Sequence, residues 1–329
     1  HPFPQKSKGL DDGDCMKNIV FGTGPLAWWV MQELLAKGES VKMASRSGTI
    51  KKTLPGGVEI VACNATVPAE VTAVCKEADT VYFCAMPPYT NWPLEFPPLV
   101  TGFLKGLAVT EAKIVFGDNL YPYGSTNGAP ITEEHPHIAP GHKGRTRAQM
   151  ARFFMAAHER GDNKVTLGRA SDFYGPDTIN AVLGEMFFRP AFSGKTANML
   201  GNLDLPHTFS YIKDFARGLV TLGHNDTAFG EAWHTPNAPT LSTREMLELI
   251  ESELGEKIKI RVAGRTMISL LGLFNPTIKE VKEMMYTWEE PYIVDHSKYE
   301  KSFGSQATNH KQAVKETVAW FKEYLSTNK

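Results

Sequence analysis

The sequence lacks an excess of charge of either sign: 35 Lys and Arg residues stand against 36 Asp and Glu residues, a formal net charge of −1. Proteins that bind the phosphate backbone of nucleic acids carry a basic surface, so we expect no nucleic-acid partner. Long hydrophobic runs are also missing. The apolar run MISLLGLF, residues 267–274, is far too short to span a bilayer, and we expect no membrane association.

Cysteine is scarce as well, with four residues and no CxxC pair or Cys/His metal spacing. Cys63 and Cys84 lie in apolar runs, where a reduced cysteine serves as a small hydrophobic residue. This usage is typical of a reducing compartment, so we predict a cytoplasmic protein without a metal site.

Residues 1–15 have neither the apolar core of a signal peptide nor any periodicity. We expect them to be a flexible leader or a remnant of an expression vector, with the natural start at Met16.

From Met16 onward the sequence alternates short apolar runs with helical segments. Apolar runs that are continuous indicate strands of a parallel sheet covered by helices on both faces. The expected strands are 18–21, 40–45, 58–63, 79–86, 112–117 and 164–169, and the expected helices are one after Pro25 and others near 67–77, 93–108 and 145–160. Right-handed crossovers then predict an α/β fold with a doubly wound, Rossmann-type parallel sheet.

The alternation ends near residue 175. Helical patches at 177–189, 242–254, 275–286 and 309–326 and a short strand at 231–235 follow. We predict a Rossmann domain over 16–175, with 207–235 returning to it. Residues 176–206 and 236–329 would form a smaller C-terminal lobe, and the cleft between the two parts would hold the substrate.

The motif GTGPLA directly follows the first strand and opens the first helix. Gly22 permits a tight turn, Gly24 lets the backbone approach a pyrophosphate, and Ala27 lets helix and strand pack closely. Free N–H groups at the helix N-terminus favour phosphates. The sequence therefore predicts a dinucleotide site formed by Gly22, Thr23, Gly24, Pro25, Leu26 and Ala27.

The second strand ends in Ser45, Arg46 and Ser47, where an NAD-preferring site would carry an acidic residue for the ribose 2′-hydroxyl. A guanidinium with two hydroxyls suits a 2′-phosphate, because arginine can donate two charge-assisted hydrogen bonds. We therefore predict NADP(H) in preference to NAD(H).

Two later strands are followed by further candidate cofactor residues. Asn64, after the third strand, is expected to hydrogen-bond the adenine. Ala85, Met86 and Pro87, after the fourth strand, would pass beneath the adenosine ribose and the pyrophosphate.

Four segments occur in a fixed order: KIVFGDNLYPYG at 113–124, ITEEHP at 131–136, GRASDFYGP at 168–176 and HTFSYIKDFARGLVTL at 207–222. Together they resemble landmarks of the extended short-chain dehydrogenase/reductases, the NAD-dependent epimerase/dehydratase group. The resemblance covers nearly all of the chain from Met16 to about residue 325. It implies a bound nicotinamide cofactor and, because the family often pairs through the helices that flank the active site, a possible homodimer.

The catalytic positions depart from the family pattern. The family's Ser/Thr falls on Asn119, and its Tyr-x-x-x-Lys pair falls on Lys143 and Arg147. The resemblance implies that Asn119 holds the substrate oxygen, Arg147 clamps the nicotinamide ribose, and Lys143 touches the cofactor and donates the proton, if its surroundings disfavour the ammonium. Tyr121 competes with Lys143 as the proton source. A solvated lysine at the start of a helix is the alternative for Lys143.

Other residues are expected at the nicotinamide end and in the substrate cleft. Ser171 and Asp172 follow the sixth strand, and the family's Asn position falls on Asp172, for which a helix cap is the alternative. The candidate substrate residues are Tyr89, Trp92, Tyr121, Asp172 and His207. Aromatic residues are also common in cores, so that alternative stays open.

These expectations combine into an NADPH-dependent reductase of a small apolar or aromatic carbonyl compound. Two alternatives stay open: a sugar epimerase or dehydratase that uses the same cofactor, and a non-catalytic sensor that binds NADP(H). The missing tyrosine favours the sensor, whereas the substrate-cleft segments favour an enzyme.

Overall fold

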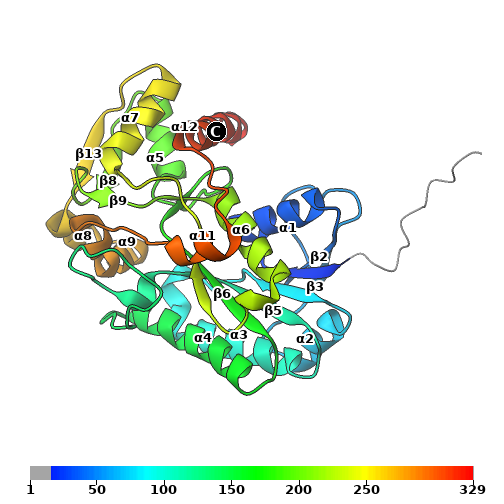
Figure 1. The fold of residues 1–329 in the computed structure, drawn as a ribbon. Helices are drawn as coiled ribbons and strands as arrows, with labels where there is room; N and C mark the ends of the chain where they lie inside the picture. Colours follow the sequence, from blue (N-terminus) through cyan, green and yellow to red (C-terminus); the bar gives the residue numbers. More distant parts are fainter. Residues whose placement is uncertain (1–15, 329) are drawn as a thin grey trace, which may run out of the picture.

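The computed structural model describes residues 16–328, and the leader expected over 1–15 lies outside them. A seven-stranded, all-parallel sheet forms the centre, in the order β11-β6-β5-β4-β1-β2-β3 (Figure 1). Its strands are β1 (Lys17–Phe21), β2 (Ser40–Ser45), β3 (Glu59–Ala62), β4 (Thr80–Phe83), β5 (Lys113–Asn119), β6 (Val165–Ala170) and β11 (Ala232–His234). The predicted doubly wound α/β fold is confirmed.

The strand order reverses between β1 and β4. From β1 the chain runs through β2 to β3 at one edge and then returns to β4 on the other side of β1. In open parallel sheets, ligands bind beyond the carboxyl ends of the strands at such a reversal. The glycine turn after β1 and the segment after β4 both lie at this point.

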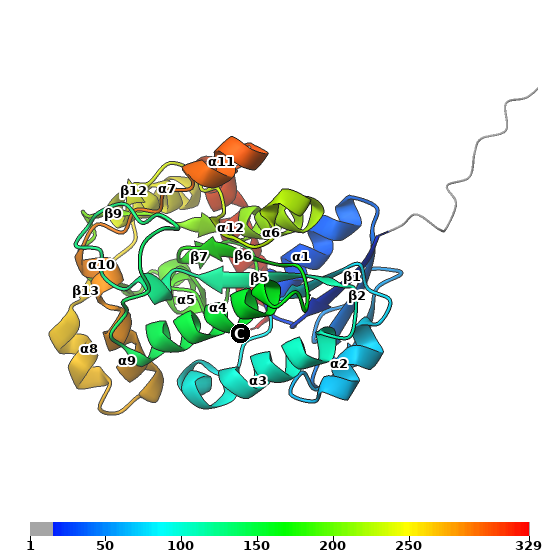
Figure 2. The ribbon, with the colours of Figure 1, turned by 60° about the horizontal axis from the view of Figure 1, so that its bottom comes forward.

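Helices cover both faces of the sheet (Figures 1 and 2). On one face α1 (Pro25–Ala36) packs against α6 (Ile212–His224); on the other lie α2 (Pro68–Cys75), α3 (Trp92–Leu107) and α4 (His142–Glu159). α4 begins before the expected residue 145. There the carboxylate of Glu283, from the second lobe, accepts the backbone N–H of Lys143 at 2.6 Å and caps the first turn.

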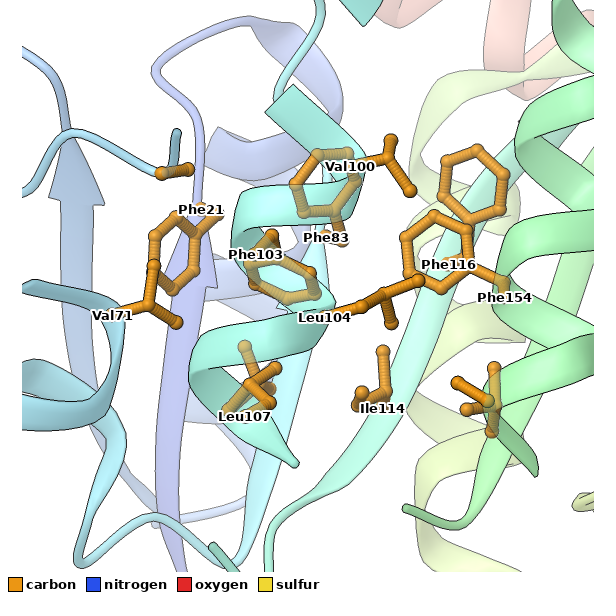
Figure 3. Close-up of a cluster of buried hydrophobic side chains, with 14 of the residues drawn as sticks. Phe21, Val71, Phe83, Val100, Phe103, Leu104, Leu107, Ile114, Phe116 and Phe154 are labelled. Atoms are coloured by element: carbon orange, nitrogen blue, oxygen red, sulfur yellow. The ribbon is translucent and has the colours of Figure 1, made fainter. Parts of the chain in front are cut away.

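Aromatic side chains fill the space between the sheet and the helices α3 and α4. Phe21, Phe83 and Phe116 of the strands meet Phe103 and Phe154 of the helices (Figure 3). The rings of Phe116 and Phe154 stack with their centroids 4.2 Å apart. Burying one phenyl ring stabilises a fold by about 1.5–3 kcal/mol, so this cluster fixes α4 firmly against the end of β5.

The second lobe has its own core, in which Phe188 of α5 (Glu185–Phe192) stacks on Phe321 of α12 (His310–Thr327). The helix α7 (Thr243–Leu254) begins at a capping box formed by Ser242. The helix expected from residue 177 begins only at Glu185. A Cβ at Gly184 would lie 2.4 Å from a backbone carbonyl oxygen, because the chain turns tightly just before the helix.

The remaining elements are short. The strands are β7 (Phe173–Tyr174), β8 (Ala197–Leu200), β9 (Pro206–His207), β10 (Ser210–Tyr211), β12 (Leu241–Ser242) and β13 (Ile260–Ala263). The helices are α8 (Arg265–Leu271), α9 (Pro276–Val281), α10 (Tyr286–Glu289) and α11 (Ser297–Phe303), and the single 3₁₀ turns are η1 (Tyr89–Asn91), η2 (Tyr121–Tyr123), η3 (Asp226–Ala228) and η4 (Lys282–Met284). Within residues 16–328, no helix has both the length and the apolar character needed to cross a membrane.

Candidate functional site

The turn between β1 and α1 has the shape that a pyrophosphate requires. Gly22 has a φ of +120°, and a Cβ there would lie 2.9 Å from the carbonyl oxygen of Cys84, so only glycine suits this position. A Cβ on Gly24 would meet nothing within 4 Å, which leaves this backbone open to a ligand. No side chain caps α1, so none competes with a phosphate for the N–H groups of its first turn. The residues present fit a bound dinucleotide.

The serine hydroxyls at the end of β2 are used within their own turn. Ser45 Oγ accepts the N–H of Gly48 at 3.1 Å, and Ser47 Oγ lies 2.9 Å from the hydroxyl of Thr49. Arg46 is exposed. Of the three side chains expected to bind a 2′-phosphate, Ser45 and Ser47 already form hydrogen bonds within the turn, and Arg46 is left for the phosphate.

The next two candidate cofactor segments lie on either side of the strand reversal. The Asn64 side-chain oxygen accepts the N–H and the hydroxyl of Thr66, at 3.1 and 2.8 Å, which leaves its amide N–H₂ for an adenine. After β4, Met86 is exposed and Pro87 is buried. Their roles in cofactor binding stay predictions.

The ends of β5 and β6 bring several candidate residues together. Asn119 is the register partner of Ala170, so the residues that follow these two positions are neighbours. The Asn119 side-chain oxygen accepts the N–H of Tyr121 at 3.1 Å. The hydroxyl of Ser171 is buried and has no hydrogen-bond partner within the described part of the chain. An unpaired buried hydroxyl is costly, and the nicotinamide end of a cofactor would give it a partner.

Tyr121 is paired with Tyr89, which precedes α3. The side chains of Tyr121 and Tyr89 share a hydrogen bond. Burial raises the pKa of both tyrosines above its ordinary value of 10.0, and the charge of Asp172 acts in the same direction. Trp92 is buried beside them, with ring centroids 5.1 Å from Tyr89 and 6.1 Å from Tyr121. Both tyrosines are therefore hydrogen-bond donors at neutral pH.

Lys143 is buried at the start of α4, with 1% of its surface exposed, so the alternative of a solvated lysine is wrong. Its Nζ lies 2.9 Å from the carboxylate of Glu280, donates to the Tyr89 carbonyl oxygen, and lies 3.8 Å from the centroid of the Tyr89 ring. A buried ammonium needs such partners. No sequence pattern pointed to Glu280 or Glu283, because they lie in α9 and η4, two short helical elements with an ordinary charged pattern.

Arg147 lies in a different, fully buried cluster. Its Nη2 is 2.6 Å from Asp118 Oδ1, and Arg169 Nε is 2.9 Å from the other oxygen of the same carboxylate. Although burial opposes it, the two guanidinium groups hold the pKa of Asp118 below its ordinary value. Arg169 also donates to the hydroxyl of Tyr123, which lies 2.9 Å from His234 Nε2. The role of Arg147 in binding the nicotinamide ribose stays a prediction. Its Nη1 group, which takes no part in the ion pair with Asp118, would be the donor to the ribose.

Asp172 and His207 form a pair at the edge of the tyrosines. His207 Nε2 lies 2.9 Å from Asp172 Oδ2, and its Nδ1 lies 3.1 Å from the carbonyl oxygen of Thr287. The ring also stacks on Trp288 with centroids 4.0 Å apart. Each ring nitrogen thus faces one oxygen, a carboxylate oxygen on one side and a backbone carbonyl oxygen on the other. The buried histidine thus holds a carboxylate that is 24% exposed.

A cavity of about 640 Å³ lies away from these residues, between α4, β11 and the loop before α4, with Arg169 in its wall. None of the predicted cofactor residues lines it. In the part of the chain that the structure describes, no cluster of three or more His, Cys, Asp or Glu side chains could hold a metal ion.

No protein-family model and no curated relative matches the chain, whereas solved structures do. The UDP-glucuronic acid 4-epimerase from Bacillus cereus, in complex with UDP-glucuronic acid and NAD, is 15% identical, and the match covers 94% of this chain and 100% of that chain with a TM-score of 0.75. A double mutant of dTDP-glucose 4,6-dehydratase from Streptomyces venezuelae with bound NAD is 16% identical, covering 95% and 98%, with a TM-score of 0.77. An epimerase from Methanothermobacter thermautotrophicus is 15% identical, covering 95% and 94%, with a TM-score of 0.77.

The predicted preference for NADP(H) over NAD(H) is wrong by this comparison, because several of these neighbours were crystallised with NAD. The physical reason lies in the turn after β2, where the two serine hydroxyls bond within the turn and Arg46 alone supported a 2′-phosphate. At this identity the likeness shows the fold. The resemblance seen in the sequence motifs is confirmed at that level: the chain has the extended short-chain dehydrogenase/reductase fold of NAD-dependent epimerases and dehydratases.

Proposed function

We propose that the chain is an NAD-dependent enzyme of the epimerase/dehydratase type, which removes a hydride from a hydroxyl-bearing carbon of its substrate. The observation that carries the proposal is the meeting of Asn119, Tyr121 and Asp172 at the ends of the neighbouring strands β5 and β6. In this fold the nicotinamide end of a cofactor lies above those strand ends. The epimerase and dehydratase neighbours support this reading, an alternative already drawn from the sequence, better than a reductase of small apolar carbonyl compounds.

The residues that would hold NAD follow the strand ends. The glycine turn and the first turn of α1 would bind the pyrophosphate, Asn64 the adenine, and the unpaired hydroxyl of Ser171 the nicotinamide end. When bound, NAD supplies the acceptor for the substrate's hydride.

The proton that leaves the substrate hydroxyl would pass to the Tyr89–Tyr121 pair, with the Asn119 amide holding the substrate oxygen. Burial keeps both tyrosines protonated at neutral pH, so the pair would act as a relay: Tyr121 would take up the substrate's proton while the pair passes one of its own protons to the Asp172 carboxylate. A tyrosine pair from two other loops would thus serve in place of the tyrosine absent from the family's position, with the ammonium of Lys143 against the Tyr89 ring.

The test measures NAD binding by fluorescence titration and hydride transfer by the near-ultraviolet absorbance of reduced nicotinamide, with nucleotide sugars and free sugars as substrates. We expect NAD to bind, and Tyr121→Phe to lower kcat by about 10²–10⁴ with an unchanged Kd for NAD, because only the proton transfer is lost. Tyr324→Phe in α12 is the matched control, because its hydroxyl bonds Glu185 of α5. Tight NAD binding without hydride transfer to or from any substrate would leave the sensor in place of the enzyme.

A further inference from the structure

The turn at the end of α8 carries a group of exposed apolar side chains. Their exposed fractions are 61% for Leu270, 44% for Leu271, 74% for Leu273 and 85% for Phe274. Elsewhere in residues 16–328, exposed apolar side chains of this size stand singly in the sequence. Because apolar surface is more stable out of water, a contiguous group of this kind marks a surface that contacts another body. We call residues 270–274 the apolar tip.

The apolar tip lies at an outer edge of the second lobe, where α8 and α9 are found on the far side of the molecule from α1 (Figures 1 and 2). Its backbone forms a tight turn. The N–H groups of Phe274 and Asn275 both donate to the carbonyl oxygen of Leu271. The chain then passes so close that a Cβ on Gly272 would lie 3.0 Å from the Cα of Lys279. A lysine is therefore placed directly beside the exposed apolar residues.

The segment around the apolar tip carries charge of one sign. Residues 257–279 contain five Lys and Arg residues and no Asp or Glu, in a chain whose total charge nearly cancels. Lys257 and Arg265 pair with carboxylates outside the segment. The exposed basic residues that form no ion pair within residues 16–328 are Lys259, Arg261, Lys279 and, just beyond the segment, Lys282. Four cations near the tip are thus left without a counter-charge from the described chain.

The acidic residues that follow the tip are used inside the protein. Glu280 lies 2.9 Å from the Nζ atom of Lys143, and Glu283 accepts the backbone N–H of the same residue at 2.6 Å. Both carboxylates are therefore turned towards the start of α4. The charge that residues 257–282 leave unpaired is positive.

Exposed apolar side chains flanked by unpaired basic residues are typical of proteins that lie on an anionic lipid surface. The apolar groups enter the boundary between headgroups and acyl chains. Each nearby Lys or Arg strengthens the binding by about fivefold through the charged headgroups. Neither contact requires a matching surface. A stable protein interface does, since it buries about 800 Å² on each partner over about 20–30 residues, far more than a single turn supplies.

We propose that the apolar tip docks the protein on an anionic lipid surface. The four exposed apolar side chains would enter the headgroup boundary, and the unpaired lysines and arginine would face the charged headgroups. The expectation of no membrane association was based on the run at 267–274, which is too short to span a bilayer, but docking on a surface requires no span. This inference is independent of the proposed function.

The experiment measures co-sedimentation of the full-length protein with two kinds of vesicle, phosphatidylcholine alone and phosphatidylcholine with about 30% phosphatidylserine. We expect binding to the phosphatidylserine vesicles to be about tenfold stronger or more, and to be lost in about 0.5 M salt, because salt screens the lysines and the arginine. Failure to bind the phosphatidylserine vesicles overturns the inference, as does equal binding to both compositions.

Apolar variants locate the inserted surface. The double variant Leu273→Ser/Phe274→Ser should weaken vesicle binding about tenfold or more, because it removes the two most exposed apolar side chains of the tip. Leu94→Ser, a single exposed leucine of α3, is the matched control and should bind as wild type does. Undiminished binding by the double variant overturns the inference. So does a solution dimer that this variant makes monomeric while the wild type binds no vesicle, because the surface then pairs two copies of the chain.

Charge variants test the second half of the contact. Lys279→Gln/Lys282→Gln should weaken binding to phosphatidylserine vesicles about tenfold, since each lysine contributes about fivefold at full contact. Lys105→Gln/Lys322→Gln is the matched control, because these exposed lysines of α3 and α12 form no ion pair in the described chain and lie outside the segment. Equal losses in the two double variants would mean that the total charge of the protein is responsible, which also overturns the inference.

Discussion

Two polar clusters lie beside the ends of β5 and β6, and burial separates them. In the first, Asp118 binds Arg147 and Arg169 with both carboxylate oxygens fully enclosed. In the second, Asp172 and the tyrosines are only partly covered, and Asp172 is held by His207. In the first cluster two guanidinium groups share one carboxylate, whereas the second leaves the buried hydroxyl of Ser171 without a partner in the described part of the chain.

This difference in burial and pairing indicates which cluster can take part in binding and chemistry. A charged group that is buried in an ion pair chiefly stabilises one arrangement of the fold. A group that is partly covered and incompletely paired can exchange partners when a ligand arrives. We therefore expect variants of the Asp118 cluster to change stability, and variants of the Asp172 cluster to change binding and turnover.

The greatest loss of stability should follow Asp118→Ala. The substitution leaves Arg147 and Arg169 buried without their common counter-charge, which costs about 3–5 kcal/mol in the free energy of unfolding. Urea unfolding followed by circular dichroism measures it. Asp226→Asn, which removes an exposed ion pair with Lys113, is the control and should change little. A loss no greater than that of the control would mean that the buried cluster does not hold the sheet ends together.

The second prediction concerns pH and the same cluster. Burial lowers the pKa of His234 from 6.5 to about 3, so the folded protein keeps this ring neutral while the unfolded chain takes up a proton below pH 6.5. Stability should therefore be full above pH 6.5 and fall by up to roughly 4 kcal/mol as the pH drops towards 3. Urea unfolding at a series of pH values measures the slope, which should flatten in His234→Gln.

His137 sharpens this test. Desolvation lowers its pKa to about 4, yet His137 is an exposed residue, so water screens much of the effect on stability. His137→Gln should flatten the same slope by a smaller amount and over a narrower pH range. A larger effect from His137 than from His234 would contradict the ranking of the two sites by burial.

The parts of this arrangement that could be predicted from sequence are those fixed by neighbours in the chain. The strands follow from continuous apolar runs, and Gly22 and Gly24 follow from the backbone geometry of a single turn. The partners of Lys143 could not be predicted, because Glu280 reaches it only through the folding of the second lobe. The NADP(H) prediction failed for a related reason: the sequence shows two hydroxyls near Arg46, but not that each bonds within its own turn.

The smallest effect on stability, and the sharpest contrast between the clusters, should come from two tyrosines of the same short turn. Tyr121→Phe removes one hydrogen bond to Tyr89 and should cost only about 1 kcal/mol of unfolding free energy while it greatly reduces turnover. Tyr123→Phe removes the acceptor of Arg169 and the partner of His234, so it should cost about 2 kcal/mol or more. Its turnover per folded molecule should equal that of wild type. Paired unfolding and activity measurements decide the point: if the two variants lose activity alike, burial does not separate the structural cluster from the catalytic one.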